Sequence, residues 1–219
     1  RYDVFNGDAD GLCALQQLHL SEPAAAQAEL VTGVKRDIAL LQRVPVVAGD
    51  EVTALDLSLD KNRTPLLDLL EKGVRVRYVD HHHPGEIPAH ENLEAHIDTA
   101  ADRGTSLLVD GLLEGRHRAW AVVGTFGDNF DVAARRAAAP LALQDEAIGR
   151  LRELGILLNY NGYGATVADL HFPPTELFAR MRPYADPLVF IDQDDAFAGL
   201  RSGYADDMAR ARAVTPECT

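Results

Sequence analysis

The sequence predicts an α/β protein in which a Rossmann-like parallel sheet is flanked by helices and followed by a mainly helical C-terminal segment. Short runs of β-branched and aromatic residues, such as 52–58 and 74–80, alternate with segments of helical periodicity. A strand, helix, strand order implies parallel pairing. From residue 131 the chain consists of Ala-rich and Leu-rich segments typical of helices. We therefore expect an α/β core over residues 1–130 and a helical completion of that core over residues 131–219.

The composition is that of an ordinary globular protein, with 219 residues of which 47% are hydrophobic and 25% charged. The longest apolar stretch, 119–126, is far shorter than the ~20 residues that a membrane span needs. No secretory segment precedes the first strand, so we expect no membrane partner. The two cysteines, Cys13 and Cys218, lie near opposite ends of the chain. This argues against a disulfide framework and predicts a cytoplasmic protein.

The formal net charge of −13 disfavours one class of partner. A protein that holds long DNA or RNA through its phosphates needs a basic surface, because lysine and arginine release the counterions. The few basic clusters here are short, and we interpret them mainly as solvated helix faces; they are Arg116-His117-Arg118, Arg135-Arg136, Arg150 with Arg152, and Arg180 with Arg182. A short or mononucleotide-sized anionic substrate fits the sequence better than a long polymer.

The first element is a buried strand over residues 2–5, followed by a tight acidic loop over 6–11. Apolar residues then recur at helical spacing, so a helix should begin close to Asp10. Asp8 and Asp10 have the Asp-x-Asp spacing that can direct two carboxylates at two neighbouring metal ions at a strand-to-helix turn. The alternative is an ordinary helix N-cap with a turn, since Asp and Gly favour both.

The next strands are expected over residues 28–34 and 52–58, with a short helix over 37–43 between them. Asp56 interrupts the apolar run of the second of these strands near its end. A buried carboxylate is costly unless it is paired or bound to a metal, because its charge loses hydration. Asp56 is therefore a candidate site residue.

The following helix is expected over residues 61–72 with Asp60 as its N-cap, and the next strand over 74–80. The strand ends in Asp80-His81-His82, at the edge where open α/β sheets place their sites. An oxygen anion beside imidazole nitrogens suits Mn²⁺, Fe²⁺, Co²⁺ or Zn²⁺ better than Ca²⁺. A solvated histidine turn that includes His83 is the alternative.

A further strand is expected over residues 94–98 and a helix over 107–113. Arg103, Thr105 and Ser106 precede this helix, whose N-terminus favours an anion. Arg103 could add a bidentate phosphate contact. An ordinary Ser/Thr cap with a surface arginine is the alternative.

The apolar segment 119–129 contains a second acid, Asp128. Its periodicity does not distinguish a strand from a helix, and of the two we favour a helix that ends near the site. Further helices are expected over residues 132–139, 141–158, 175–181, 188–200 and 205–213.

Four of these segments together resemble the motifs of the DHH phosphoesterases: Asp8-Ala9-Asp10-Gly11, Asp56 at a strand end, Asp80-His81-His82, and Gly124-Thr125-Phe126-Gly127-Asp128. They occur in the order and approximate spacing of the family, over roughly residues 2–130. The family includes RecJ-like exonucleases, oligoribonucleases, cyclic-dinucleotide phosphodiesterases and inorganic pyrophosphatases. The resemblance implies a parallel α/β domain and two divalent metal ions, usually Mn²⁺ with Mg²⁺ or Co²⁺ as alternatives. It also implies hydrolysis of a phosphoester or phosphoanhydride.

The resemblance also implies a role for each matching position. Asp8 is expected to bind one metal ion, Asp56 to bridge both ions, and three residues to bind the second ion: Asp10, His81 and Asp128. His82 should face the scissile phosphate, while Asp80 orients an imidazole. Arg103, Thr105 and Ser106 are the further phosphate contacts that we expect. Two ions about 3.5–4 Å apart can share a hydroxide and clamp an in-line displacement.

The chain departs from the family pattern in two places. Pyrophosphatases and many oligoribonucleases carry a histidine where this chain has Val4, and RecJ-like members carry an aspartate where it has Asn6. The first ion should therefore have one fewer protein ligand, with the Asn6 oxygen as an auxiliary donor. The Gly-Gly-Gly-His stretch of an accessory substrate-binding domain does not occur in the sequence. We expect residues 131–219 to lead toward such a domain outside this chain, unless substrate is bound by other means.

The sequence therefore predicts a nuclease-like, Mn²⁺-dependent phosphodiesterase that acts on short single-stranded oligonucleotides or dinucleotides. One alternative is a pyrophosphatase, which Val4 disfavours. Another is a catalytically silent scaffold or nucleotide sensor, which the complete set of expected ligands disfavours. A homodimer is an open alternative to a monomer.

Overall fold

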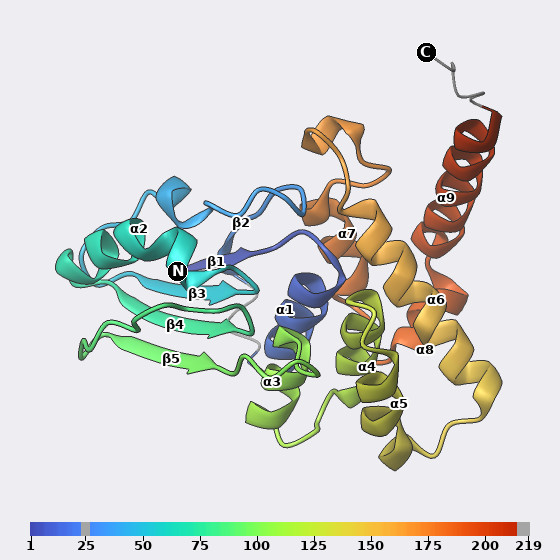
Figure 1. The fold of residues 1–219 in the computed structure, drawn as a ribbon, viewed down its shortest axis with the longest axis horizontal. Coiled ribbons are helices and arrows are strands. Elements are labelled where there is room, and N and C mark those ends of the chain that lie inside the picture. The colour runs from blue at the N-terminus through green and yellow to red at the C-terminus, as the bar shows by residue number, and fades with distance from the viewer. Residues whose placement is uncertain (23–26, 214–219) are drawn as a thin grey trace.

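A computed structural model describes residues 1–22 and 27–213 of the chain, and Cys218 lies outside them. Five strands of the described part form one sheet: β1 (Tyr2–Phe5), β2 (Glu29–Val31), β3 (Glu51–Leu55), β4 (Arg75–Asp80) and β5 (Leu93–Ile97). Their order is β2-β1-β3-β4-β5, and every neighbouring pair is parallel (Figure 1). This arrangement confirms the predicted α/β fold with a parallel sheet.

Helices cover both faces of the sheet. The helix α2 (Leu59–Glu71) lies on one face, while α1 (Ala9–Ser21) and α3 (Thr105–Leu112) lie on the other (Figure 1). Beyond α1, away from the sheet, stand the remaining helices: α4 (Arg118–Gly127), α5 (Asp131–Ala138), α6 (Asp145–Asn161), α7 (Pro174–Met181), α8 (Pro187–Gln193) and α9 (Asp195–Ala213). The mainly helical character of the C-terminal part is therefore confirmed.

The helices bury both faces of the sheet. Successive side chains of a strand therefore enter two different apolar clusters, because they point to opposite faces. In β1, Val4 joins the apolar cluster that contains Leu66 and Leu70 of α2. The next residue, Phe5, joins the cluster that contains the apolar face of α1 and extends through α4 and α6 to Leu200 of α9. One continuous core therefore links the sheet to the C-terminal helices.

Several boundaries near the sheet differ from the sequence prediction. The strands expected over 28–34 and 52–58 already end at Val31 and Leu55. The helix expected over residues 37–43 is only a short 3-10 turn at Leu41–Arg43. The N-cap of α2 is Ser58, so Asp60 lies in the first turn and not at the cap. There its negative charge still favours the helix N-terminus.

The helices at the C-terminal end also differ from the prediction. Segments 188–200 and 205–213 were expected to be separate helices, whereas α8 ends at Gln193 and α9 runs unbroken from Asp195 to Ala213. The break falls at Asp194, which has extended backbone dihedrals and whose side chain accepts a hydrogen bond from the N–H of Ala196. The helix boundary is set by this local cap.

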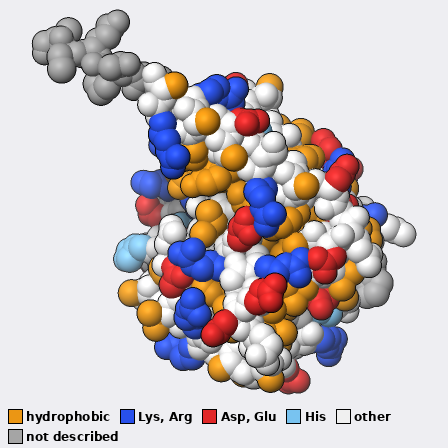
Figure 2. All heavy atoms as spheres, turned by 90° about the vertical axis from the view of Figure 1, so that its right-hand side faces the viewer, with side chains coloured by type: hydrophobic (Ala, Val, Ile, Leu, Met, Phe, Trp, Pro, Cys, Tyr) orange, Lys and Arg blue, Asp and Glu red, His pale blue; other side chains and the backbone are white. Residues whose placement is uncertain are grey.

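Charged side chains of both signs are interspersed over the face formed by the C-terminal helices (Figure 2). Several of the basic residues are paired with acids: Arg150 with Asp192, Arg152 with Asp131, Arg180 with Asp194 and Asp195, and Arg201 with Glu153. These pairs support the interpretation of the basic clusters as solvated helix faces. No helix among the described residues has the length and apolar character needed to cross a bilayer.

Candidate metal centre

The candidate site lies at the carboxyl ends of the central strands. Phe5, Leu55 and Val79 are aligned across β1, β3 and β4. The residues that follow them therefore meet at one edge of the sheet, which is where parallel α/β sheets place their sites. Asp56 follows β3, and His81 follows β4.

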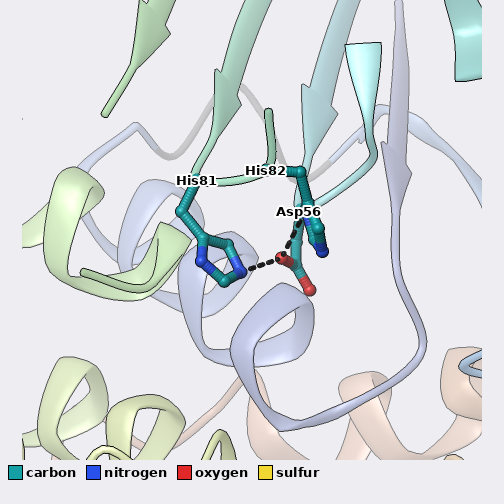
Figure 3. Close-up of side chains that lie close together, drawn as sticks. All are labelled: Asp56, His81 and His82. Carbon is teal, nitrogen blue, oxygen red and sulfur yellow. Dashed lines mark ion pairs between the residues drawn. The ribbon is translucent and has the colours of Figure 1, made fainter. Parts of the chain in front are cut away.

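The backbone of Asp56 turns sharply at this edge. Its N–H still donates to the carbonyl of Val79 at 3.1 Å, which extends the ladder by one residue beyond β3. Its φ of 58° lies in the left-handed region, which aspartate tolerates better than most residues. The carboxylate is buried. Figure 3 shows His81 and His82 both directed at it.

The Nε2 atom of His81 faces three carboxylates. It lies 3.4 Å from Asp56 Oδ1, 3.6 Å from Asp128 Oδ2 and 3.9 Å from Asp10 Oδ2. Two donors bound about 2.1 Å from the same ion are separated by about 3.0–3.5 Å, depending on the angle between them. These four residues could therefore hold one divalent ion after a small contraction of the site.

Two groups of candidate ligands occur in the described part of the chain. One consists of Asp56, His81 and His82, and the other of Asp10, His81 and Asp128. Both contain His81, so they overlap at one place in the structure. Carboxylate oxygens combined with imidazole nitrogen suit Mn²⁺, Fe²⁺, Co²⁺ or Zn²⁺.

The acids of this cluster are short of compensating charge. Burial, together with the neighbouring charge of Asp56, raises the pKa of Asp10 to about 6. Burial, together with the charge of Asp8, raises the pKa of Asp56 to about 7, and burial with the charge of Asp10 raises the pKa of Asp128 to about 7. Without a metal ion the cluster therefore retains protons, and a divalent ion would displace them.

The surrounding acids raise the pKa of His81. Burial by itself would lower it, but the hydrogen bond to Asp56 and the charge of Asp10 raise it to about 10. The Nε2 atom of the imidazole thus carries a proton, whereas an Nε2 bound to a metal ion would carry none. The proton stands in for part of a cation's charge, so this donor set fits a divalent metal.

The first turn of α3 holds Asp10 in place. The N–H groups of Thr105 and Ser106 donate to Asp10 Oδ2 and Oδ1 at 2.5 and 2.9 Å, and the Ser106 hydroxyl also donates to Oδ1. The Thr105 hydroxyl donates to Asp56 Oδ1 at 3.2 Å. All four side chains are buried. The anion at this helix N-terminus is therefore a side chain of the protein.

Thr105 and Ser106 were expected to contact phosphate, and in this structure their donors are directed at Asp10 and Asp56. Arg103 is also elsewhere: its Nε lies 3.5 Å from Asp98 Oδ2, and its side chain is exposed. It does not line the cavity described below. The phosphate contacts expected of these three residues stay a prediction.

His82 contacts Asp80, the acid that the sequence predicts to orient an imidazole. His82 Nδ1 lies 2.7 Å from Asp80 Oδ1, so the ring N–H donates to the buried carboxylate and Nε2 is left for a second partner. This hydrogen bond raises the pKa of His82. His83 is exposed and accepts a hydrogen bond from the N–H of Gly85.

Sequence reasoning missed Lys35. Its Nζ lies 2.5 Å from Asp8 Oδ2, 3.4 Å from Asp128 Oδ1 and 2.7 Å from Asn159 Oδ1 of α6. Burial alone would lower the pKa of Lys35, but the charges of Asp8 and Asp128 raise it above its ordinary value. A single lysine in a loop carries no motif, and its partners lie far away in the sequence. The one sequence signal for Lys35 is that it follows shortly after β2, whose carboxyl end lies at the same edge of the sheet as the site.

Comparison with known proteins adds two similar structures. No model of a protein family and no curated protein matches the chain. A crystal structure of exonuclease RecJ bound to manganese is 22% identical with a TM-score of 0.44, over 97% of this chain and 58% of that one. RecJ from Thermus thermophilus in complex with Mn²⁺ is 22% identical with a TM-score of 0.46, over 92% of this chain and 33% of that one. The chain resembles RecJ. It spans less than two thirds of the length of either structure.

The acids and histidines of the candidate site open onto a cavity of about 530 Å³. Asn6, Lys35, Asp128 and His82 are among the residues that line it. Asn6 Nδ2 donates to the backbone carbonyl of Lys35 at 3.3 Å, while its buried Oδ1 has no partner among the described residues. The auxiliary role expected of the Asn6 oxygen therefore stays a prediction.

Proposed function

We propose that the protein is a metal-dependent phosphodiesterase that hydrolyses short nucleic-acid or dinucleotide substrates. One observation carries the proposal: the carboxylates of Asp10, Asp56 and Asp128 converge on His81 Nε2. This convergence lies beside a cavity that His82 also lines. A single divalent ion at this point would neutralise buried charge that the protein leaves uncompensated.

The ion would be held by Asp10, Asp56, His81 and Asp128, with Mn²⁺ as the first candidate and Mg²⁺ or Co²⁺ as alternatives. Bound there, a divalent ion supplies a Lewis acid that lowers the pKa of water and polarises a phosphate oxygen. Thr105 and Ser106 keep two of the carboxylates in position through the hydrogen bonds described above. The family resemblance implies a site with two ions, one of them bound by Asp8. Binding of that ion would require the ion pair between Asp8 and Lys35 to break.

His82 would act on the phosphate itself. Because Asp80 accepts a hydrogen bond from Nδ1–H, the Nε2–H of a protonated His82 can donate to a non-bridging phosphate oxygen. Charge develops on that oxygen in the transition state, so the hydrogen bond strengthens as the reaction proceeds. Asp80 positions the ring and stabilises its positive form.

A short substrate fits the dimensions and charge of the protein. The cavity of about 530 Å³ lies within the range of small-molecule sites, about 300–1,000 Å³. The formal charge of −13 and the paired arginines of the C-terminal helices disfavour binding of a long polymer through its phosphates. Di- to pentanucleotides are therefore the substrates to test first.

Turnover by the purified protein tests the proposal. Di- to pentanucleotides, a cyclic dinucleotide and pyrophosphate are each incubated with Mn²⁺, Mg²⁺ or Co²⁺, and products are quantified by chromatography. We expect cleavage of the nucleotides that needs the metal, is abolished by Asp56→Asn and is unchanged by Asp60→Asn, an exposed acid in the first turn of α2. Cleavage of pyrophosphate alone would indicate a phosphoanhydride hydrolase. Absence of turnover with every substrate and metal would sink the proposal and favour a silent scaffold or sensor.

A further inference from the structure

Both oxygens of Asp8 are already in use. Oδ1 accepts from the N–H groups of Asp10 and Gly11 at 3.1 and 3.2 Å, as the N-cap of α1. Oδ2 lies 2.5 Å from Lys35 Nζ. Neither group of candidate metal ligands in the described part of the chain contains Asp8. An ion bound by Asp8 would therefore have to displace an ammonium group that is already there.

Lys35 is held by groups outside the acidic cluster. Its Nζ donates to the neutral amide oxygen of Asn159 at 2.7 Å, and its ammonium lies 5.7 Å from the ring centroid of Tyr163. A neutral oxygen acceptor and an aromatic face both suit an ammonium ion. Neither would be needed if Lys35 only filled an empty metal position. The α6 end of the site is therefore built around this lysine.

The backbone of Lys35 is fixed as well. Its N–H donates to the carbonyl of Gly162 at 2.8 Å, and its carbonyl accepts from Asn6 Nδ2 at 3.3 Å. A Cβ added at Gly162 would lie 3.2 Å from the Asp8 Cβ and 3.3 Å from the Lys35 Cβ, so the three chain segments are in close contact. The Lys35 side chain is only 23% exposed. Moving it out of the site would break contacts with two separate segments of the chain.

We propose that the centre holds one divalent ion, beside His81, and that the Lys35 ammonium is the second cation of the site at the Asp8 side. The inference rests on the proposed function only in treating the cluster as a metal centre. One divalent ion and one ammonium supply three positive charges against the four carboxylates of Asp8, Asp10, Asp56 and Asp128. Lys35 thus compensates Asp8 permanently, whatever the concentration of metal in solution.

Counting bound Mn²⁺ tests the inference without reference to activity. The metal-free protein is titrated with Mn²⁺ by calorimetry, the bound metal is counted by elemental analysis after dialysis, and the electron paramagnetic resonance spectrum is recorded. We expect one ion per chain and the spectrum of an isolated Mn²⁺ for the wild type. In Lys35→Met, which keeps an unbranched side chain one atom shorter and removes its charge, we expect two ions and an exchange-coupled spectrum.

Two controls accompany this variant. Lys35→Arg keeps the positive charge and should still bind one ion. Lys61→Met removes another lysine that lines the same cavity but lies against Asp60, at 3.7 Å, and it should also bind one ion. Circular dichroism confirms that each variant is folded, and the count for the wild type is decisive even if Lys35→Met does not fold.

Each remaining outcome contradicts the inference in its own way. Two ions in the wild type would overturn it and leave the proposed function standing. One ion in both the wild type and a folded Lys35→Met would show that Lys35 does not take a metal position. No bound ion together with no turnover would remove the proposed function as well.

Discussion

Asp80 and His82 form a pair in which a fully buried carboxylate controls an imidazole that reaches the cavity, with 2.7 Å between Oδ1 and Nδ1. Asp80→Asn keeps the shape of the acid and removes its charge. Because the hydrogen bond to Asp80 raises the pKa of His82, we expect that pKa to fall. The protonated ring would then be lost at lower pH.

The measurement is the pH dependence of kcat. In Asp80→Asn we expect the alkaline limb of the profile to move to lower pH and kcat at neutral pH to fall about 10–100-fold, the usual effect of losing such a supporting partner. His83→Ala, which changes the exposed neighbouring histidine, serves as the control. An unshifted profile would show that Asp80 does not tune His82.

Asp56→Asn tests the central carboxylate. Asparagine accepts the left-handed backbone at this position, where φ is 58°, so the fold should survive. The amide cannot supply the negative charge that the ion needs, and we expect turnover to fall by more than about 100-fold. The assay is run at saturating Mn²⁺, with the Tm of the metal-free variant as the check on folding. Turnover close to the wild-type value would argue against any role of Asp56 in holding metal.

Ser106→Ala separates support of Asp10 from contact with phosphate. The variant loses the hydroxyl that donates to Asp10 but keeps the backbone N–H that also does so. We expect Mn²⁺ affinity to fall about 10-fold, while KM for the nucleotide at saturating Mn²⁺ stays unchanged.

Arg103→Ala is the companion variant. Its guanidinium lies against Asp98 on the surface, so we expect neither Mn²⁺ affinity nor KM to change. A raised KM in either variant at saturating Mn²⁺ would instead support the phosphate contacts that the sequence predicts.

Stability of the metal-free protein should depend on pH through the acidic cluster. The pKa is about 6 for Asp10 and about 7 for Asp56 and Asp128, against about 4 in an unfolded chain. Between these values the folded state binds more protons than the unfolded state, so the free energy of unfolding falls as pH rises through this window. Protonated His81, with a pKa of about 10, loses its contribution in the same direction at higher pH.

The expected result is a lower Tm for the metal-free protein at pH 8 than at pH 5, measured by calorimetry after chelation. Mn²⁺ should raise the Tm more at pH 8 than at pH 5, because fewer protons compete with it. If the Tm of the metal-free protein at pH 8 equals or exceeds its Tm at pH 5, the carboxylates of the cluster do not bind the protons that a metal ion would displace.

The edge of the sheet where the site lies could be predicted because local signals agree there. Asp56 interrupts an apolar strand, and the two histidines follow the next strand along the chain. Parallel pairing then brings both ends together. Asp128 could be placed near them only through its motif, since the preceding apolar run does not distinguish helix from strand.

Other parts of the site depend on contacts between distant segments. A helix N-terminus predicts an anion but not which one, and at α3 the anion is Asp10, 95 residues before Thr105. Lys35 is missed for the same reason, because its acceptor Asn159 belongs to a helix with an ordinary amphipathic pattern. Local patterns carry no information on such pairs.

The contact between Lys35 and Asn159 joins residues 124 positions apart, and this separation has a consequence for the order of events during synthesis. Residues 1–130 contain all the carboxylates of the cluster, but the lysine has its full set of partners only after α6 has docked. A nascent chain that ends before α6 would meet divalent ions with Asp8 less firmly paired. The number of ions taken up would then depend on whether metal arrives before or after α6 has docked.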